Sequence, residues 1–311
     1  MVESFLRLAH RLGGMVPRVF VGAAIIAGLG VYAPHDAATQ HRLSAPFADS
    51  GVLTLVTDGT AGDIDPASNE SDPSDLIARN IDNQLVSYDG ARIDRFVPAL
   101  ATAWQSNADK SVWVFHLRRD VRFHTGWCCM TAADVKYSIE RTVEAGLAGS
   151  YLFGRFLGKP SQQIKIRDPY TIEFDLGVPQ PFFLGAVASE YTGPVLDARA
   201  LTAHEKQHDW GHAWAIDHDL GTGPYTIQRW AHGQQVTLAR FSGYWGGWQG
   251  PHFSTIAVRT VPEASTRREL VLQRYLSLGA SEPIRKSTCA LSVLGSRTAP
   301  FPRSLGVILA K

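Results

Sequence analysis

The chain has 311 residues, of which 45% are hydrophobic and 19% are charged, so it can bury a sizeable core and is long enough for about two domains. Its formal net charge of +1 gives no electrostatic field that would favour nucleic acid or an anionic surface, and no nucleic-acid partner is expected. The aromatic content of 10% suits a protein whose clefts are lined by aromatic side chains, although most of these will lie in the core.

The first forty residues are typical of an export signal. An uncharged run over residues 19–33 follows three arginines and precedes the small residues Ala37 and Ala38. This order predicts a signal peptide over residues 1–40 and a periplasmic location. The run is shorter than the roughly 20 residues of a membrane-spanning helix, so an uncleaved membrane anchor is the less favoured alternative. No cysteine follows the run closely, so a lipid-anchored form is not expected.

The rest of the chain alternates strand and helix patterns. Residues 111–117 alternate β-branched and aromatic residues, which predicts a strand, and a second short strand is expected at Val121–Phe123. Thr131 precedes Asp134 in the pattern of a helix N-cap with an acid in the first turn, and Gly233-Gln234 indicates a hairpin turn. The other predicted strands are 53–56, 171–176, 223–228, 235–239 and 256–260, and the predicted helices are 75–85 and 132–143. Together they indicate an α/β fold with mixed sheets.

The three cysteines do not form a disulfide framework. Cys128 and Cys129 are adjacent, and a disulfide between neighbours would close a strained eight-membered ring, so such a bond is not expected. A bridge from one of them to Cys289 is an alternative that would need the tail to fold back, and idle thiols are the favoured interpretation.

One motif could carry metal chemistry. His204-Glu205-Lys206-Gln207-His208 matches H-E-x-x-H, the helix in which two histidines bind zinc and the glutamate acts as a base. However, Trp214 stands where the longer form of this motif has a third histidine, and the polar run Glu205–Asp209 favours a solvated surface helix. A zinc metalloprotease, or metal binding through His204, His208, His212 and His218, remains the alternative. The favoured hypothesis is a binding protein that is not an enzyme and has no metal or cofactor.

Several motifs follow one another in a recognisable order. Pro98–Trp104 reads PALATAW, Phe115–Gly126 reads FHLRRDVRFHTG, and Thr131–Arg141 reads TAADVKYSIER; Gly221–Tyr225 and Tyr244–Gly247 follow. In this order the chain resembles the family of bacterial extracellular solute-binding proteins that serve ABC importers of peptides, nickel and related solutes. The resemblance covers about residues 53–272 and also implies a helix over Arg79–Asp89. Residues 127–130 depart from the family pattern, which leaves the local turn open.

The resemblance implies a periplasmic-binding-protein-like fold of class II, the peptide-binder type, without its third lobe. Residues 51–84 and 194–272 would form a discontinuous lobe I, and residues 85–193 an inserted lobe II. Residues 273–311 do not continue the family pattern, and we expect an aberrant, out-of-frame or disordered tail. The alternative is a shortened natural end that packs on lobe I.

The resemblance also implies a function and a site. The chain would be the substrate-binding component of an ABC importer, with an oligopeptide or similar small solute as ligand and an inner-membrane ABC permease as partner. The residues expected to contact the ligand are Asn69, Glu70, Ser71, Tyr151 and Tyr191. The alternative is a surface loop for the first three and core or lid aromatics for the two tyrosines.

Overall fold

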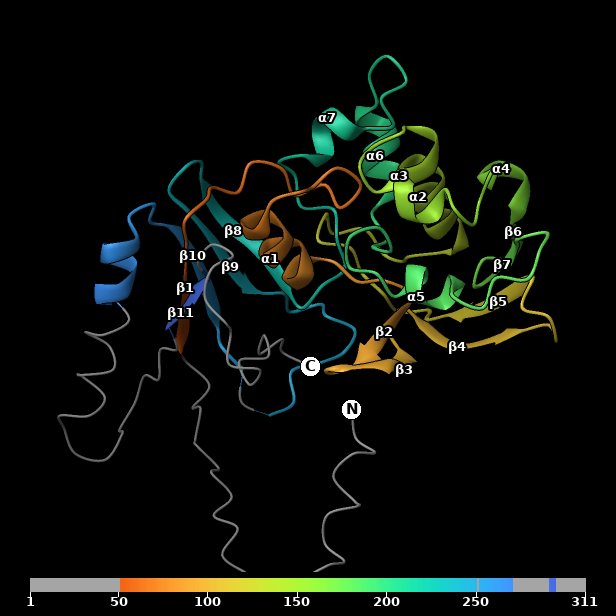
Figure 1. Ribbon diagram of the computed structural model, residues 1–311, viewed down its shortest axis with the longest axis horizontal. Coiled ribbons are helices and arrows are strands. Elements are labelled where there is room, and N and C mark those ends of the chain that lie inside the picture. The colour runs from red at the N-terminus through yellow and green to blue at the C-terminus, as the bar shows by residue number, and fades with distance from the viewer. Residues whose placement is uncertain (1–50, 251, 271–290, 295–311) are drawn as a thin grey trace, which may run out of the picture. The chain divides into compact units, whose positions relative to one another are not determined.

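The structure, a computed structural model, describes residues 51–250, 252–270 and 291–294. They contain strands β1–β11, helices α1–α7 and a further helical segment at 264–270 (Figure 1). All of these residues belong to one compact unit. No helix among them is both long and apolar enough to span a membrane. The predicted signal peptide at 1–40, the alternative membrane anchor at 19–33 and Cys289 lie outside the described residues.

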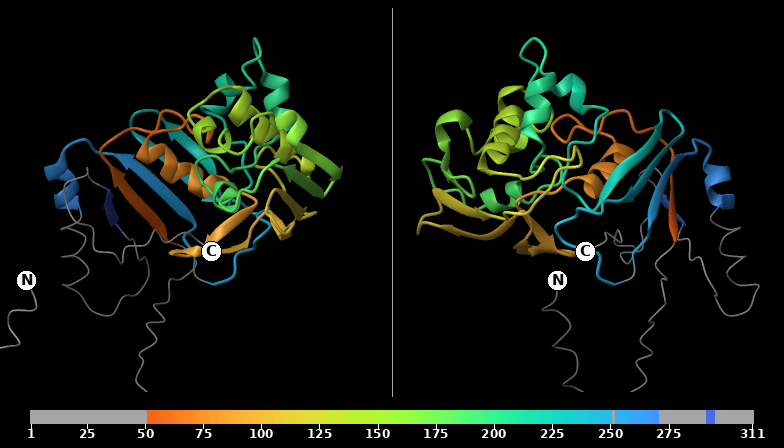
Figure 2. Two further views of the ribbon diagram at one scale, coloured as in Figure 1. Left: turned by 45° about the vertical axis from the view of Figure 1, so that its right-hand side comes forward. Right: turned by 180° about the vertical axis from the view of Figure 1, so that it is seen from behind.

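The first sheet has five strands and mixes parallel with antiparallel pairs, as the sequence predicts. Strand β1 lies between two parallel neighbours, β10 and β11, and β10 continues into the antiparallel pair β9 and β8. Helix α1 lies against this sheet, as Figures 1 and 2 show. The bounds are β1 Val52–Thr57, α1 Asp72–Ile81, β8 Tyr225–Ala231, β9 Gln235–Arg240, β10 Thr255–Thr260 and β11 Leu291–Leu294.

The second sheet has four antiparallel strands in the order β4-β5-β7-β6, with helices α2 and α4 packed against it. A separate pair, β2 and β3, forms a two-stranded sheet. The bounds of the strands are β2 Val86–Asp89, β3 Arg92–Pro98, β4 Ala101–Ser106, β5 Val112–Leu117, β6 Ile164–Asp168 and β7 Thr171–Asp175. Those of the helices are α2 Ala132–Glu144, α3 Ser150–Phe153, α4 Pro160–Gln163, α5 Phe183–Val187, α6 Ala198–His204 and α7 His212–Ala215.

Each of the two larger sheets has its own hydrophobic cluster. One cluster gathers buried side chains from residues 85–195, including Phe115, Phe174 and Ile139. The other joins β1, α1 and β8–β10 through residues such as Leu55 and Tyr225. This arrangement suits two lobes built from interleaved parts of the chain, and the lobe boundaries at 84 and 194 stay a prediction.

Helix α2 confirms the sequence prediction in detail. The Thr131 side chain accepts a hydrogen bond from the Ala133 amide at 3.3 Å, and Asp134 Oδ2 accepts one from the Thr131 amide at 2.8 Å. This reciprocal capping box satisfies amide groups that the first helical turn would leave without partners. On the helix itself, Val135, Ile139 and Thr142 are buried.

Two element predictions are wrong. The second strand of the expected hairpin, Val121–Phe123, is reduced to an isolated bridge between Arg122 and Cys128, because β4 and β7 already occupy both edges of β5. The helix implied at Arg79–Asp89 instead begins at Asp72, after the N-cap Ser71, and ends at Ile81. The chain becomes extended at Asp82 and enters strand β2, so eight of the eleven residues in that range are not helical.

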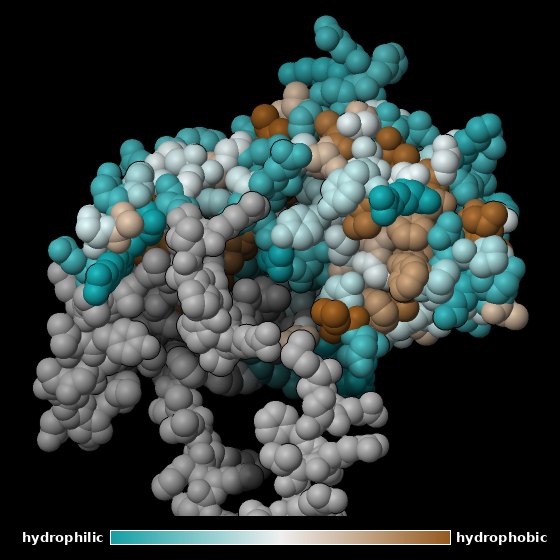
Figure 3. Space-filling view, viewed as in Figure 1, coloured by the Kyte–Doolittle hydropathy of each residue, from teal (hydrophilic) through white to brown (hydrophobic). Residues whose placement is uncertain are grey.

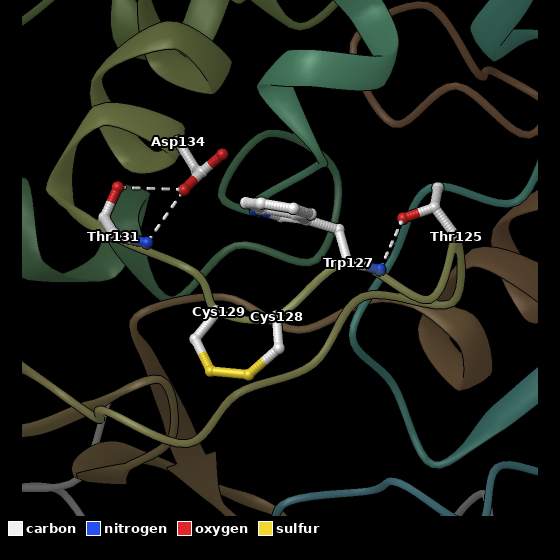
Figure 4. Close-up of a disulfide and its surroundings, with 6 residues drawn as sticks. All are labelled: Thr125, Trp127, Cys128, Cys129, Thr131 and Asp134. Atoms are coloured by element: carbon white, nitrogen blue, oxygen red, sulfur yellow. Dashed lines mark hydrogen bonds between the residues drawn. A yellow bond between two sulfur atoms is a disulfide. The ribbon is translucent and has the colours of Figure 1, made fainter.

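The expectation about the adjacent cysteines is also corrected. Cys128 and Cys129 are joined by a disulfide in the loop before α2, as Figure 4 shows. The peptide bond between them is cis, and it brings their Cα atoms to 3.0 Å from each other. The sequence analysis expected the strain of the eight-membered ring to prevent this bond.

The predicted tail lies almost entirely outside the described residues. Its four described residues, 291–294, form strand β11, which pairs in parallel with β1. The expectation for residues 273–311 as a whole stays a prediction.

Candidate functional site

Three segments that are distant in the sequence meet at Gly149. Its amide donates a hydrogen bond to the carbonyl oxygen of Ala67 at 2.7 Å. A Cβ added at Gly149 would lie 2.9 Å from Thr192 Cγ2 and 3.2 Å from the Ala67 oxygen, so no other residue type fits there without displacing a neighbour. The loop after Asp65, the loop before α3 and the segment after α5 are therefore in direct contact. Each of these segments carries at least one of the ligand-contacting residues that the sequence predicts.

Three predicted ligand-contacting residues lie in the loop after Asp65, and the side chains of two of them form hydrogen bonds with the backbone of the loop and of α1. Asn69 is buried, and its Oδ1 accepts a hydrogen bond from the Ser71 amide at 3.0 Å. Ser71 is the N-cap of α1, and its hydroxyl accepts a hydrogen bond from the Ser74 amide at 3.3 Å. Glu70, between them, is exposed, and its carboxylate forms no hydrogen bond or ion pair with any described residue.

The two tyrosines differ in how firmly they are held. Tyr151, in the short helix α3, is 68% exposed. Tyr191 is 46% exposed, but its hydroxyl accepts a hydrogen bond from Arg79 Nη2 at 3.2 Å, and the Arg79 guanidinium lies over its ring. Arg79 also forms ion pairs with Asp75 and Glu190, so it anchors the segment after α5 to helix α1.

Most of the exposed large hydrophobic side chains lie in residues 85–193, the part of the chain that also contains Tyr151 and Tyr191. Seven of the eight large ones among the described residues fall within residues 85–193, and only Val52 lies outside. On the face shown in Figure 3, hydrophobic residues gather on the right, where Figure 1 places α2, α3, α5 and the β2–β3 pair. Grouped apolar surface of this kind is typical of ligand or partner contacts.

A buried ion pair fixes the start of the first loop. Arg141 of α2 contacts Asp65 through two parallel hydrogen bonds, Nη1 to Oδ1 at 2.8 Å and Nη2 to Oδ2 at 2.7 Å. Both side chains are at most 1% exposed. Burial opposes ionisation of Asp65, but hydrogen bonds and positive charge from Arg141 outweigh it and hold the pKa of this carboxyl far below its usual range. The pair thereby ties the loop that carries Asn69–Ser71 to helix α2.

A histidine completes this pair. His212 Nδ1 lies 2.9 Å from Asp65 Oδ2, and the hydrogen bond to Asp65 raises the pKa of His212 above its usual value. Charged His212 is therefore favoured in the folded state. Its contribution to stability is complete below the unfolded-state pKa of about 6.5 and is lost as the pH rises through the higher folded-state pKa.

We predict that the His212→Ala variant is less stable than the wild type at pH 6, and that this difference shrinks by pH 9. The effect should stay below about 1 kcal/mol because the side chain is partly exposed and screened by solvent. Urea unfolding of both proteins at several pH values measures it. His208→Ala, at a fully exposed histidine, is the control and should show no such trend. A stability difference that grows between pH 6 and pH 9 would contradict the prediction.

The H-E-x-x-H segment does not form the helix that the sequence suggested. Helix α6 ends at His204, and the following residues form turns in which Gln207 and His208 have positive φ. The two histidines are therefore not one helical turn apart. His204 instead stacks on Trp214, with ring centroids 3.7 Å apart, and His208 points into solvent. Within the described part of the chain, no group of three His, Cys, Asp or Glu side chains is placed to hold a metal ion.

Sequence reasoning missed a cavity of about 450 Å³ beside the C-terminal end of α1. Its walls come from four separate parts of the chain: residues 78–80 and 82–84; residues 87 and 97–99, in and beside the β2–β3 pair; residues 190 and 194; and residues 224, 244–249 and 252. The one local hint was the cluster of aromatics in Tyr244–Trp248. Because the lining residues are up to 174 positions apart, no short sequence pattern could have revealed the cavity.

Comparison with known proteins identifies the relatives of this fold. The profile of the bacterial extracellular solute-binding proteins, family 5 (middle), matches residues 95–278. The periplasmic oligopeptide-binding protein OppA of Escherichia coli is 30% identical over 198 residues, which are 58% of this chain and 34% of OppA. The peptide transport periplasmic protein SapA of Salmonella typhimurium is 28% identical over 239 residues, 72% of this chain and 42% of SapA.

A solved structure agrees. The periplasmic binding protein DppA of Helicobacter pylori, in complex with the peptide STSA, superposes with a TM-score of 0.63 at 26% identity, over 74% of this chain and 46% of DppA. The chain thus spans between about a third and just under half of the length of these relatives. Since the family profile covers more than half of the chain and the sheets match a solved relative, the protein belongs to the bacterial extracellular solute-binding proteins of family 5.

Proposed function

We propose that this chain contributes to the binding of peptides or similar small solutes for an ABC importer, in the periplasm, with an inner-membrane permease as its partner. Family membership supports the class of function, and the relatives' names supply peptides as the first ligands to test. The observation that supports the proposal is the junction at Gly149, because Ala67, Gly149 and Thr192, which meet there, lie within three residues of Glu70, Tyr151 and Tyr191 in the chain.

The free groups at this junction suit a peptide. The Glu70 carboxylate can accept hydrogen bonds from ligand N–H groups, and the exposed rings of Tyr151 and Tyr191 offer apolar contact with hydrogen-bonding hydroxyls at their edges. Asn69 and Ser71 would contribute by holding the loop in place, since their side chains already serve its backbone. Arg79 keeps Tyr191 in position from α1.

The test is peptide binding by the full chain. We would incubate it with a mixture of peptides of two to five residues, identify bound species by native mass spectrometry, and measure the affinity of each one by calorimetry. Tyr151→Ala should weaken binding about five- to tenfold, the usual effect of losing one well-placed aromatic contact. Phe182→Ala is the matched control because this ring is 79% exposed but lies outside the three segments, and it should leave affinity unchanged. Retention of no peptide, or equal binding by the Tyr151 variant, would refute the proposal.

A further inference from the structure

The cavity beside α1 contains a buried carboxyl group that lacks a partner. Asp82, the first residue after the helix, is only 5% exposed and lines the cavity. Its Oδ2 is buried without a hydrogen-bond partner in the described part of the chain. Leaving such a group unpaired costs free energy, which a donor placed in the cavity would recover.

The charges around Asp82 leave it without a cation. Burial, together with the nearby acids Asp219 and Asp65, raises the pKa of Asp82 well above its usual value. Arg79 is the one arginine or lysine among the described lining residues, and its guanidinium is engaged by Asp75 and Glu190. The raised pKa favours the uncharged acid as long as no cation is near. A cation bound beside Asp82 would favour the ionised form, and the lining would then hold one cation, Arg79, and two acids, Asp82 and Glu190, with a net charge of −1.

The opposite wall is aromatic. Tyr244, Trp245 and Trp248 line the cavity, and both indole N–H groups are already used, Trp245 Nε1 by Asn83 Oδ1 at 2.9 Å and Trp248 Nε1 by a backbone carbonyl. Arg118 lies over the Trp245 ring, 4.3 Å from its centroid, so this ring offers apolar contact more than a site for a further cation. The wall therefore suits an uncharged hydrocarbon body.

We propose that this cavity binds a small organic monocation, with its ammonium group at Asp82 and its apolar body against Tyr244, Trp245 and Trp248. The volume of about 450 Å³ falls in the range of small-molecule sites and is too small for a long peptide. The net charge of the lining is neutralised by one positive charge. This site goes beyond the proposed peptide function because it uses none of the five residues at the Gly149 junction.

The test compares phenethylammonium with its uncharged analogue 2-phenylethanol, each titrated into the full chain by calorimetry. The wild type should bind the amine at least tenfold more tightly than the alcohol. Asp82→Asn keeps the shape of the side chain but removes its charge, and it should abolish this preference. Asp94→Asn, at an exposed aspartate that does not line the cavity, should retain it.

Equal affinity of the wild type for the two compounds would overturn the proposal, and so would binding of neither, which would mean that water satisfies Asp82. If Asp82→Asn does not fold, the wild-type comparison still decides. Tyr151→Ala separates the two proposals, because it should weaken peptide binding without changing amine binding. If the wild type binds the amine but no peptide, the proposed peptide function has failed. If it binds peptide but shows no preference for the amine, the proposed cation site has failed.

Discussion

Replacing Arg141 with methionine should lower the free energy of unfolding by about 3–5 kcal/mol, the usual cost of leaving one partner of a buried ion pair without the other. The variant keeps most of the apolar volume of the side chain but takes the paired guanidinium away from the fully buried Asp65 carboxylate, which keeps its contact with His212 Nδ1 at 2.9 Å. It also removes the hydrogen bond from Arg141 Nε to the carbonyl oxygen of Trp210. Urea unfolding at pH 7, followed by circular dichroism, measures the change.

Two further variants show whether the stranded charge causes the loss. Arg92→Met breaks an ion pair with Asp94 in which both side chains are at least 60% exposed, and should cost no more than about 1 kcal/mol. The double variant Asp65→Asn, Arg141→Met removes both charges and should recover part of the stability lost by Arg141→Met alone. An Arg141→Met effect as small as that of Arg92→Met would show that the buried pair does not stabilise the fold.

Gly223→Ala should destabilise the protein by about 3 kcal/mol or more, the upper end of the range for overpacking, because the added methyl group would meet backbone atoms that cannot move aside. A Cβ at this position would lie 2.6 Å from the Asn80 oxygen and 2.7 Å from the Asp82 nitrogen. The amide of Gly223 also donates to the Ile81 oxygen at 2.8 Å, which fixes the end of α1 against the start of β8. Thermal and urea unfolding would both report the loss.

The control for this prediction is Gly158→Ala. An added Cβ there meets nothing within 4 Å, so stability should change by no more than about 1 kcal/mol, and a small gain is possible because alanine restricts the unfolded chain. Equal stability of the Gly223 and Gly158 variants would mean that the close approach of Gly223 to α1 is not required for folding.

The sequence could predict those elements whose stabilising contacts lie within a few residues of one another. The capping box at Thr131 and Asp134 lies within four residues, and the alternation in β5 within six, so both can be read from a short window. The end of α1 could not be read in this way. It depends on Gly221 and Gly223 packing against Ile81, contacts made by residues about 140 positions further along the chain.

The structure shows that two of the motifs that carry the family resemblance contact each other. His124, in the FHTG turn, donates its amide to the Gly221 oxygen at 2.9 Å, and its ring nitrogens lie 2.6 Å from Asp219 Oδ1 and 3.0 Å from the Gly223 oxygen. The sequence places these motifs 95 or more residues apart. Their contact connects the end of the loop after β5 with the beginning of β8.

The ligand-contacting residues stay a prediction. They were placed through the resemblance, and the structure brings their segments together, but the anchoring of Tyr191 by Arg79 and of the first loop by Arg141 could not be foreseen. Both arginines had ordinary helical positions in the sequence. What distinguishes them is the burial or pairing supplied by partners more than 70 residues away.

The position of β1 sets an order of events during synthesis. Its partner β10 begins at Thr255, 203 residues after Val52, so β1 leaves the ribosome long before that neighbour exists. At about 5–20 residues per second, this delay lasts on the order of 10–40 seconds. During that time the emerging chain can complete the β4–β7 sheet, which needs residues only up to Asp175. Strand β1 remains without its partner β10. The sheet that begins the described chain is thus the last to be assembled.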